Sequence, residues 1–174
     1  IIQADPERRF VVPSAPGKRS RDDEKVTDML YACYALAEEG SDFSEKLSAI
    51  RARYEEIIKG LSLKLSLEEE FQKIEENFRN KAGKDYAASR GEYLNGIVMA
   101  AYLKFPFIDA AEVIFFDEHG KFDDYRTDQV LSKRLEQMDA AVIPGFYGSM
   151  PDGSVKTFSR GGSDVTGSIV ARAV

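Results

Sequence analysis

The stretch TFSRGGSDVTGSIVAR, residues 157–172, is the most informative part of this sequence about its fold. The run at residues 155–158 predicts a short β-strand that enters this stretch. After the two glycines, apolar side chains recur at helical spacing on one face, at Val165, Ile169, Val170 and Ala173. The stretch therefore predicts a strand, a tight turn and a helix in series, which is typical of α/β proteins.

The turn between this strand and this helix has the chemistry of an anion receptor. Gly161 and Gly162 lack Cβ atoms, so the backbone can turn tightly and approach a ligand closely. A helix that begins at Ser163 or Asp164 directs unpaired amide groups and a partial positive charge into the gap. The Arg160 guanidinium adds a planar fork of donors that fits a carboxylate or a phosphate. Ordinary α/β corners also use glycines and a Ser or Asp cap, so the local chemistry leaves a purely structural turn open.

The composition indicates a globular protein whose surface does not suit nucleic acid. The chain has 174 residues, enough to bury a sizeable core, and 43% of them are hydrophobic. Asp and Glu outnumber Lys and Arg by 30 to 24, which leaves no basic excess to neutralise phosphates. No apolar run approaches the roughly 20 residues of a membrane span. We therefore expect one domain, or most of one, that is cytoplasmic and binds neither nucleic acid nor membrane.

The chain offers few ligands for a metal ion. Its single cysteine, Cys33, excludes an internal disulfide and fits a reducing compartment. Because Cys33 has apolar helical neighbours, a buried thiol is expected rather than a nucleophile. The single histidine, His119, lies in a turn without a second His or Cys to complete a site. The sequence therefore predicts no metal held by protein ligands.

A second strand-to-helix connection occurs near the start of the chain. Residues 9–15 predict a buried strand that enters a loop at 16–17. Residues 26–37 carry apolar side chains at the spacing of a helix that ends at Gly40. Thr27 lies in the first turn of this helix. Its hydroxyl is suited either to a substrate carboxylate or to a backbone carbonyl.

Residues 41–82 are organised differently, as two amphipathic helices with narrow apolar stripes over 43–61 and 67–78. Ser66 is expected to cap the second of them. We expect a helical hairpin laid on the main body, with charged outer faces that carry no chemistry.

The next helix, residues 85–102, contains a glycine that needs a reason. Glycine in a helix interior costs about 1 kcal/mol relative to alanine, so Gly91 in the SRGE block at 89–92 is expected to interrupt the helix. Close approach of another backbone or of a ligand would explain this glycine. Glu92 could then accept from a substrate ammonium group. A solvent-exposed glutamate beside a packing glycine fits the sequence equally well.

The rest of the chain alternates short apolar strands with helices. Residues 111–116 and 140–145 predict strands, the first of them buried, and Thr127 is expected to cap the helix between them. This alternation indicates an α/β sheet covered by helices on both faces. Ligands of such sheets bind beyond the carboxyl ends of the strands. Thr27, Glu92 and the loop at 160–164 all lie at strand ends or helix starts, which is compatible with one cleft.

The sequence resembles the aspartate kinases. Five blocks carry the resemblance: SAPGKR at 14–19, KVTDML at 25–30, SRGEYLN at 89–95, PGFYG at 144–148 and FSRGGSDVT at 158–166. The last block is similar to the family's GRGGSD signature, which is far more specific than a lone glycine motif. The loop between the first two blocks is longer than in many members. The resemblance covers most of the chain outside residues 41–82.

The resemblance implies a fold and a reaction. The fold is the three-layer α/β/α sandwich of the amino-acid kinases, here with residues 41–82 as an added helical hairpin. The reaction is ATP-dependent phosphorylation of the side-chain carboxylate of L-aspartate to 4-phospho-L-aspartate, the first step of lysine, threonine and methionine biosynthesis. MgATP is the expected phosphoryl donor, and no protein ligand for Mg²⁺ is identified.

The resemblance also implies roles for the candidate residues. Glu92 would hold the ammonium group of aspartate, and Arg160 would clamp its α-carboxylate. Thr27, Ser163 and the amides of residues 161–162 would orient the side-chain carboxylate as the nucleophile.

Asp164 is the implied catalytic residue, which orients a lysine from an N-terminal KFGG-type loop. Residues 1–174 are expected to be part of the catalytic domain, without that loop, the nucleotide-binding half or the regulatory ACT domains. This part is expected to be inactive alone, and the full-length protein is expected to be a homo-oligomer. Alternatives are another amino-acid kinase, a kinase fused to homoserine dehydrogenase, and a non-catalytic amino-acid-binding fragment.

Overall fold

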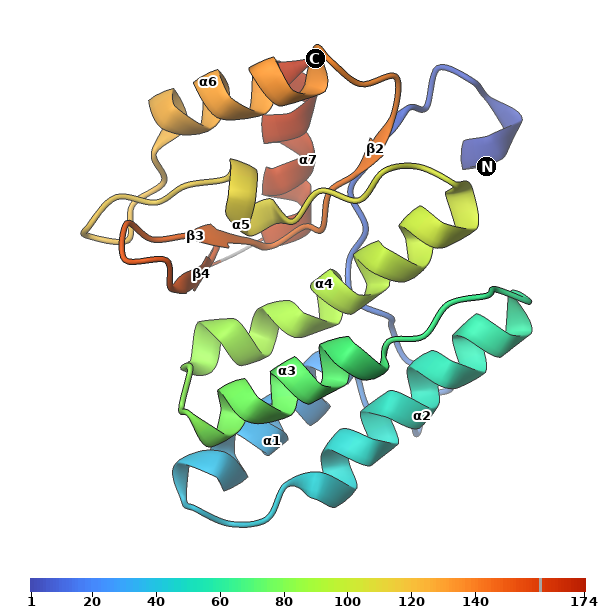
Figure 1. The fold of residues 1–174 in the computed structure, drawn as a ribbon, viewed down its shortest axis with the longest axis vertical. Helices are drawn as coiled ribbons and strands as arrows, with labels where there is room; N and C mark the ends of the chain where they lie inside the picture. Colours follow the sequence, from blue (N-terminus) through green and yellow to red (C-terminus); the bar gives the residue numbers. More distant parts are fainter. Residues whose placement is uncertain (160) are drawn as a thin grey trace.

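The computed structural model describes residues 1–159 and 161–174, and the long helix α4 (Lys84–Leu103) runs through its middle (Figure 1). On one side of α4 lie three helices: α1 (Val26–Glu38), α2 (Ser44–Gly60) and α3 (Glu68–Arg79). The other side holds β1 (Phe10–Val11), α5 (Ala110–Val113), α6 (Asp124–Leu135), β2 (Ala141–Val142), β3 (Tyr147–Ser149), β4 (Val155–Thr157) and α7 (Gly162–Ala173). A short 3₁₀ helix, η1 (Ile2–Ala4), precedes β1.

The helices α1 to α4 share one hydrophobic core. Both helices expected within residues 41–82 are present, but they are not an accessory on the surface. Their apolar stripes interlock with α1 and α4, and Cys33 lies in the same core as a buried thiol. The rings of Phe43 and Phe78 meet edge-on at 5.6 Å, a geometry that favours aromatic pairs. The predicted hairpin is therefore part of a helical unit that supports α4.

The described strands form two short sheets. β1 pairs with β2 in parallel, with Phe10 opposite Ala141, and β3 pairs with β4 in antiparallel register. Single parallel bridges from Phe107 to Val142 and from Phe115 to Ser149 extend each pair by one segment. The strands predicted over 9–15 and 140–145 are thus present but shorter than expected.

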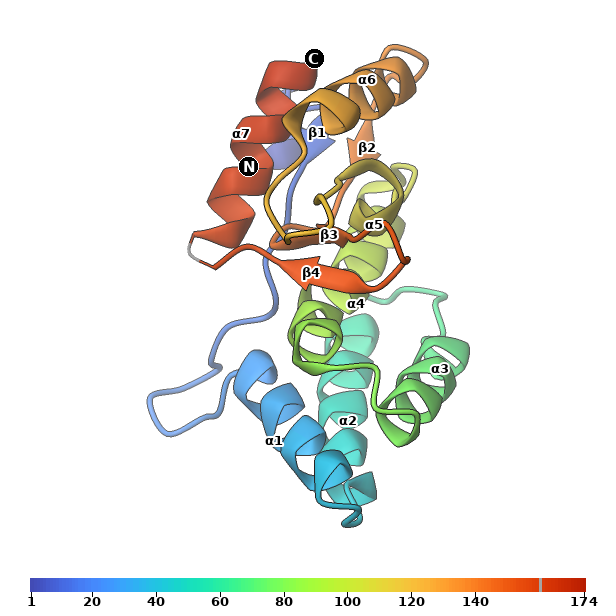
Figure 2. The same ribbon diagram turned by 90° about the vertical axis from the view of Figure 1, so that its left-hand side faces the viewer.

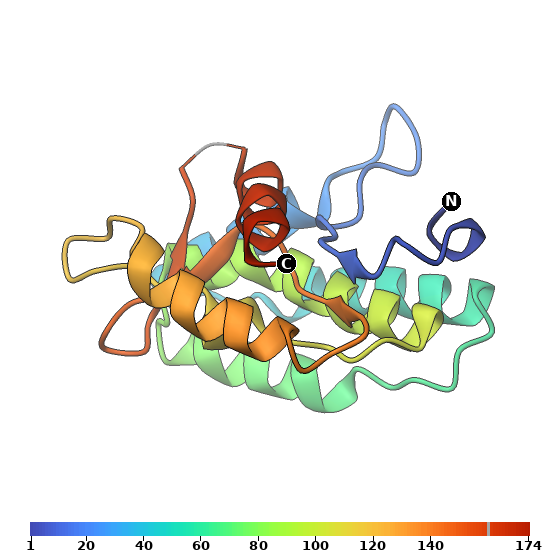
Figure 3. The same cartoon turned by 90° about the horizontal axis from the view of Figure 1, so that it is seen from above.

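The helices α6 and α7 cover these strands (Figure 2). Seen from above, α7 appears nearly end-on with α6 crossing beside it (Figure 3). Ile169 and Val170 of α7 share a core with Leu131 of α6 and Ile143 after β2. This confirms the apolar face predicted for the last helix. Within the described ranges, no helix is both long and apolar enough to cross a membrane.

The strand predicted over residues 111–116 is wrong in its first half. Residues 110–113 form the helical turn α5, because the Asp109 carboxylate accepts the Ala111 amide at 3.0 Å and caps it. Only Phe115 and Phe116 form bridges. A short apolar run is compatible with either a strand or a helical turn, and the helix cap at Asp109 favours the turn.

The predicted cap at Thr127 is also wrong. α6 begins earlier, where Asp123 accepts the Arg126 amide at 3.0 Å. Thr127 is fully buried, and its hydroxyl oxygen accepts the Phe115 amide at 3.0 Å. Leu67, not the predicted Ser66, occupies the cap position of α3, although the Ser66 hydroxyl accepts the Glu68 amide at 3.2 Å.

Candidate functional site

The carboxyl ends of β1 and β2 bring three loops together. The Pro13 carbonyl, after β1, accepts the Gly145 amide, after β2, at 3.1 Å. A Cβ atom on Gly145 would lie 2.6 Å from the hydroxyl oxygen of Ser163 in the first turn of α7. Glycine is therefore required for α7 to begin at this edge. The edge is where parallel sheets bind ligands.

The helix α4 reaches the same edge through the loop after β1. A Cβ atom on Gly91 would lie 2.8 Å from the Cβ atom of Ala15, and the Asn95 side-chain amide donates to the Ser14 carbonyl at 2.6 Å. This confirms that Gly91 accommodates another segment of the chain. The expected interruption at the SRGE block is wrong, because α4 continues through it. The hydrogen bonds of α4 remain intact, because the loop that carries Ala15 occupies only the volume that a methyl group on Gly91 would fill.

Glu92 is a buried acid with a free acceptor. Glu92 is only 7% exposed. Its Oε2 atom is buried and has no hydrogen-bond partner in the described part of the chain. Burial raises the pKa of this carboxyl to about 7, although hydrogen bonding by the Ala15 backbone and the charge of Arg90 oppose the shift. A buried carboxylate oxygen without a donor is suited to receive a cation.

A buried cation lies two residues before this acid. Arg90 is 6% exposed, and its guanidinium carbon lies 4.6, 4.4 and 5.3 Å from the ring centres of Tyr86, Tyr93 and Tyr147. The Ser89 hydroxyl accepts from its Nε and Nη2 atoms at 3.1 and 2.9 Å. Tyr86 and Tyr93 share a face of α4 with Arg90, but Tyr147 comes from β3, and nothing in the sequence indicates that the three rings enclose this cation.

Thr27 lies in the first turn of α1, and that turn faces Gly91. The neighbouring Val26 side chain would be 3.5 Å from a Cβ atom on Gly91. The Thr27 residue is half-buried. The structure thus packs the turn that carries Thr27 against the turn that carries Glu92.

The loop before α1 is held by an arginine of α2 that the sequence did not single out. Arg53 of α2 is 4% exposed and donates to the Glu24 carbonyl at 2.6 Å and to the Gly17 carbonyl. It also pairs with Asp23 at 3.0 Å. Hydrogen bonds from Arg19 and the charge of Arg53 hold the pKa of the Asp23 carboxyl well below its usual range. Arg53 falls within the apolar stripe of α2, and a charged residue at such a position is a sequence signal for a buried, paired side chain.

The helix α7 begins at Gly162, one residue before the predicted start. A Cβ atom there would lie 2.2 Å from the Phe146 side chain. Phe146 itself has φ +85°, a strained value for a bulky residue, and its amide donates to the Thr166 hydroxyl at 3.0 Å. Phe146 lies in the PGFYG block at 144–148, but no role was predicted for it. Strain of this kind is not visible in a sequence.

The elements that carry Thr27, Glu92 and Ser163 therefore meet around the loop after β1, whereas the prediction for Arg160 lies outside the described residues. Gly161 has φ +56°, which glycine adopts freely, and Asp164 is exposed in the first turn of α7. Within the described ranges no group of His, Cys, Asp and Glu is placed to hold a metal ion.

Comparisons with known proteins agree with this architecture. Aspartokinase 3 of Bacillus subtilis is 37% identical over 186 aligned residues, which cover 98% of this chain and 41% of that protein. The crystal structure of Clostridium acetobutylicum aspartate kinase superposes with a TM-score of 0.96 at 49% identity, over 99% of this chain and 40% of that one. No family model matches the chain.

A more distant structure, E. coli aspartokinase III in complex with aspartate and ADP, matches with a TM-score of 0.76 at 26% identity, over 99% of this chain and 41% of that one. The mixed helix and strand fold thus matches that of solved aspartate kinases. The chain belongs to the aspartate kinase family, and it spans about two fifths of the length of these relatives.

Proposed function

We propose that the protein phosphorylates the side-chain carboxylate of L-aspartate with ATP, giving 4-phospho-L-aspartate. The observation that carries the proposal is the unpartnered, buried carboxylate oxygen of Glu92 at the edge where α7 begins. An amino acid supplies the ammonium group that this oxygen lacks. The related E. coli enzyme was solved with aspartate and ADP, which supports the same pair of substrates here.

The proposed roles follow the chemistry of the side chains. Glu92 binds the ammonium group, and Arg160 binds the α-carboxylate as a bidentate fork. Thr27, Ser163 and the amides of residues 161–162 orient the side-chain carboxylate of the substrate. Asp164 orients a lysine that neutralises charge on the transferring phosphoryl group.

Phosphoryl transfer requires alignment and charge stabilisation more than covalent help from the protein. A substrate carboxylate is ionised at neutral pH, so it attacks without a strong base. The amides at the start of α7 favour an anion held there. The described residues contribute mainly to the amino-acid side of such a site.

Magnesium does not fit a protein site in the described chain, because no cluster of metal ligands exists there. The ion is expected to arrive with the nucleotide phosphates. In the whole protein we further propose that the two short sheets belong to one three-layer α/β/α sandwich. A homo-oligomer acting at the start of lysine, threonine and methionine biosynthesis is part of the same proposal.

Proton release on aspartate binding tests the role of Glu92. Because the pKa of its carboxyl is raised to about 7, the free site is largely protonated at pH 6. An ammonium group favours the ionised form, so binding releases a proton. Calorimetry of the chain at pH 6 in buffers of different ionisation enthalpy should detect this release with aspartate. Succinate, which has no ammonium group, should release none, and Glu92→Gln should abolish the release.

Steady-state kinetics of the full-length enzyme test the role of Arg160. Arg160→Ala should raise the KM for aspartate at least tenfold and leave the KM for ATP nearly unchanged. Equal increases of both would place Arg160 on the nucleotide side. Binding of aspartate without any turnover by the full-length protein would replace a kinase with an amino-acid sensor.

A further inference from the structure

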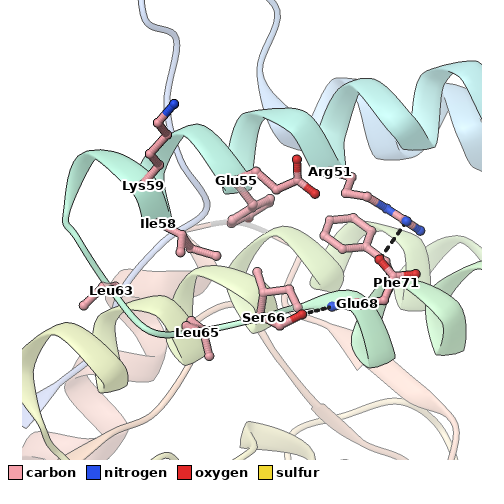
Figure 4. A pocket seen from close by; sticks show the side chains of 11 residues that line it. Arg51, Glu55, Ile58, Lys59, Leu63, Leu65, Ser66, Glu68 and Phe71 are labelled. Carbon is pink, nitrogen blue, oxygen red and sulfur yellow. Dashed lines mark hydrogen bonds and ion pairs between the residues drawn. The ribbon is translucent and has the colours of Figure 1, made fainter.

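A cavity of about 400 Å³ lies between α2, the connection that follows it and α3 (Figure 4). Its volume is in the range of about 300 to 1,000 Å³ in which proteins bind small organic molecules. The cavity is separate from the edge of the sheet described above. Its lining consists of Arg51, Tyr54, Glu55, Ile58, Lys59, Leu63, Leu65, Ser66, Leu67, Glu68 and Phe71.

Most of the cavity wall is apolar. The rings of Tyr54 and Phe71 lie 6.2 Å apart, and aliphatic side chains from α2 and the connection complete the wall. A compact hydrocarbon or aromatic group would be removed from water here, which favours its binding. The wall therefore selects a ligand with an apolar body.

Three charged residues of α2 at this cavity, Arg51, Glu55 and Lys59, leave polar groups without partners, and Lys59 forms no ion pair among the described residues. Arg51 donates to Glu68 through Nη1 at 2.8 Å, but its Nε atom is buried and has no acceptor among the described residues. Glu55, one turn later on α2, is exposed and forms no ion pair within the described ranges. Residues four apart share one face of a helix, so a donor and an acceptor lie side by side.

A ligand that satisfies both groups carries an acceptor and a cation together. The carboxylate of an α-amino acid would accept from the Arg51 Nε–H, and its ammonium group would pair with Glu55. Glu68 is not available for this, because its carboxylate already accepts from Arg51 and from Gln72. The charges thus match a zwitterion better than a simple acid or a simple amine.

One lining residue connects the cavity to the sheet edge. The Tyr54 hydroxyl donates to the Gly91 carbonyl at 2.7 Å, and Tyr54 is fully buried. Gly91 is the residue that lies against Ala15 and precedes Glu92. A ligand that shifts the Tyr54 ring therefore acts on the backbone that carries Glu92.

We propose that this cavity binds an α-amino acid with an apolar side chain, and that Tyr54 transmits its occupancy to Gly91 and Glu92. The binding does not depend on the function proposed for the sheet edge. Only the catalytic meaning of the coupling rests on that function, so the test uses neither aspartate nor ATP.

Three probes with similar apolar bodies separate the possible ligand chemistries: L-phenylalanine, phenethylamine and 3-phenylpropionate. In titrations of the chain followed by ¹H–¹⁵N NMR, phenylalanine should bind at least tenfold more tightly than either single-charge analogue. Glu55→Gln should weaken phenylalanine at least fivefold. Glu45→Gln, the same change on α2 away from the cavity, should have no effect.

Leu65→Trp, which fills the cavity from its connecting loop, should abolish binding. Equal affinities for the three probes, or no saturable binding of phenylalanine, would overturn the assignment of the ligand. Glu55 is exposed, so Glu55→Gln is expected to fold. It therefore still tests the proposal if Leu65→Trp fails to fold.

The same spectra test the coupling. Phenylalanine should shift the amide resonances of Gly91 and Glu92 in the wild type. In Tyr54→Phe it should still bind, but these shifts should be lost, because the bond to the Gly91 carbonyl is absent. Binding to the wild type without these shifts would overturn the role of Tyr54.

Discussion

Gly91 of α4 and Ala15 of the loop after β1 lie so close that a Cβ atom at position 91 would be 2.8 Å from the Ala15 Cβ atom. Real side chains do not approach so closely, so the missing methyl group is what lets this loop lie beside Glu92. The contact joins the helical unit to the strands at the edge where the proposed site lies.

We expect Gly91→Ala to destabilise the protein by roughly 1 to 3 kcal/mol, because overpacking outweighs the gain in helix propensity. Gly167→Ala is the matched control, since a Cβ atom at that helical position meets nothing within 4 Å. The control should stabilise by up to about 1 kcal/mol. Urea unfolding measures both changes. A stabilised Gly91→Ala variant would show that the loop is free to move away.

The stability of the protein should fall as Glu92 ionises. Burial raises the pKa of this carboxyl from 4.5 to about 7, so between these values the folded state binds more protons than the unfolded state. Stability from this group is therefore full below about pH 4.5 and is lost as the pH rises through about 7. The loss amounts to roughly 3 kcal/mol at most.

Glu92→Gln, which cannot ionise, should lack this component. The difference in unfolding free energy between the variant and the wild type should grow in favour of the variant from pH 5 to pH 8. Urea unfolding at several pH values measures it, and other titrating groups cancel in the difference. A constant difference would mean that water reaches the carboxylate.

Arg90→Met should destabilise the protein by roughly 2 to 4 kcal/mol. The substitution removes the guanidinium, and with it the contacts to three tyrosine rings and the hydrogen bonds to Ser89. Arg90→Lys should be intermediate, since it keeps the charge but not the planar stacking. Thermal or urea unfolding at pH 7 gives the order. If the methionine variant were as stable as the wild type, the three tyrosine rings would stabilise residue 90 by apolar packing alone, without a contribution from its charge.

Lys104→Gly should stabilise the protein by up to about 1 kcal/mol. Lys104 ends α4 with φ +60°, a left-handed conformation that costs a residue with a Cβ atom about 1 kcal/mol. Its side chain is exposed, so little else is lost. Gly40→Ala, at the equivalent end of α1 with φ +70°, should destabilise by a similar amount. Calorimetric unfolding of both variants checks the opposite signs.

Local patterns in the sequence were sufficient for the helices and for the candidate site. Apolar side chains spaced by three and four residues predicted α1 to α4, α6 and α7 near their observed bounds, because such a stripe is buried only in a helix. The RGGSD block and the SRGE block pointed to the aspartate kinase family, and the comparisons bear this out. The roles of the individual site residues stay predictions.

Contacts between distant segments could not be predicted from local patterns. The apolar stripes over 43–61 and 67–78 were sufficient to predict two amphipathic helices, but that these helices share one core with α1 and α4 follows only from the packing in three dimensions. The hydrogen bond from Tyr54 to Gly91 and the contact of Tyr147 with Arg90 join residues that no periodicity relates. The strained φ of Phe146 also has no signal in the sequence. Periodicity reports which face of an element is buried, whereas the partner on that face is set by how whole elements pack.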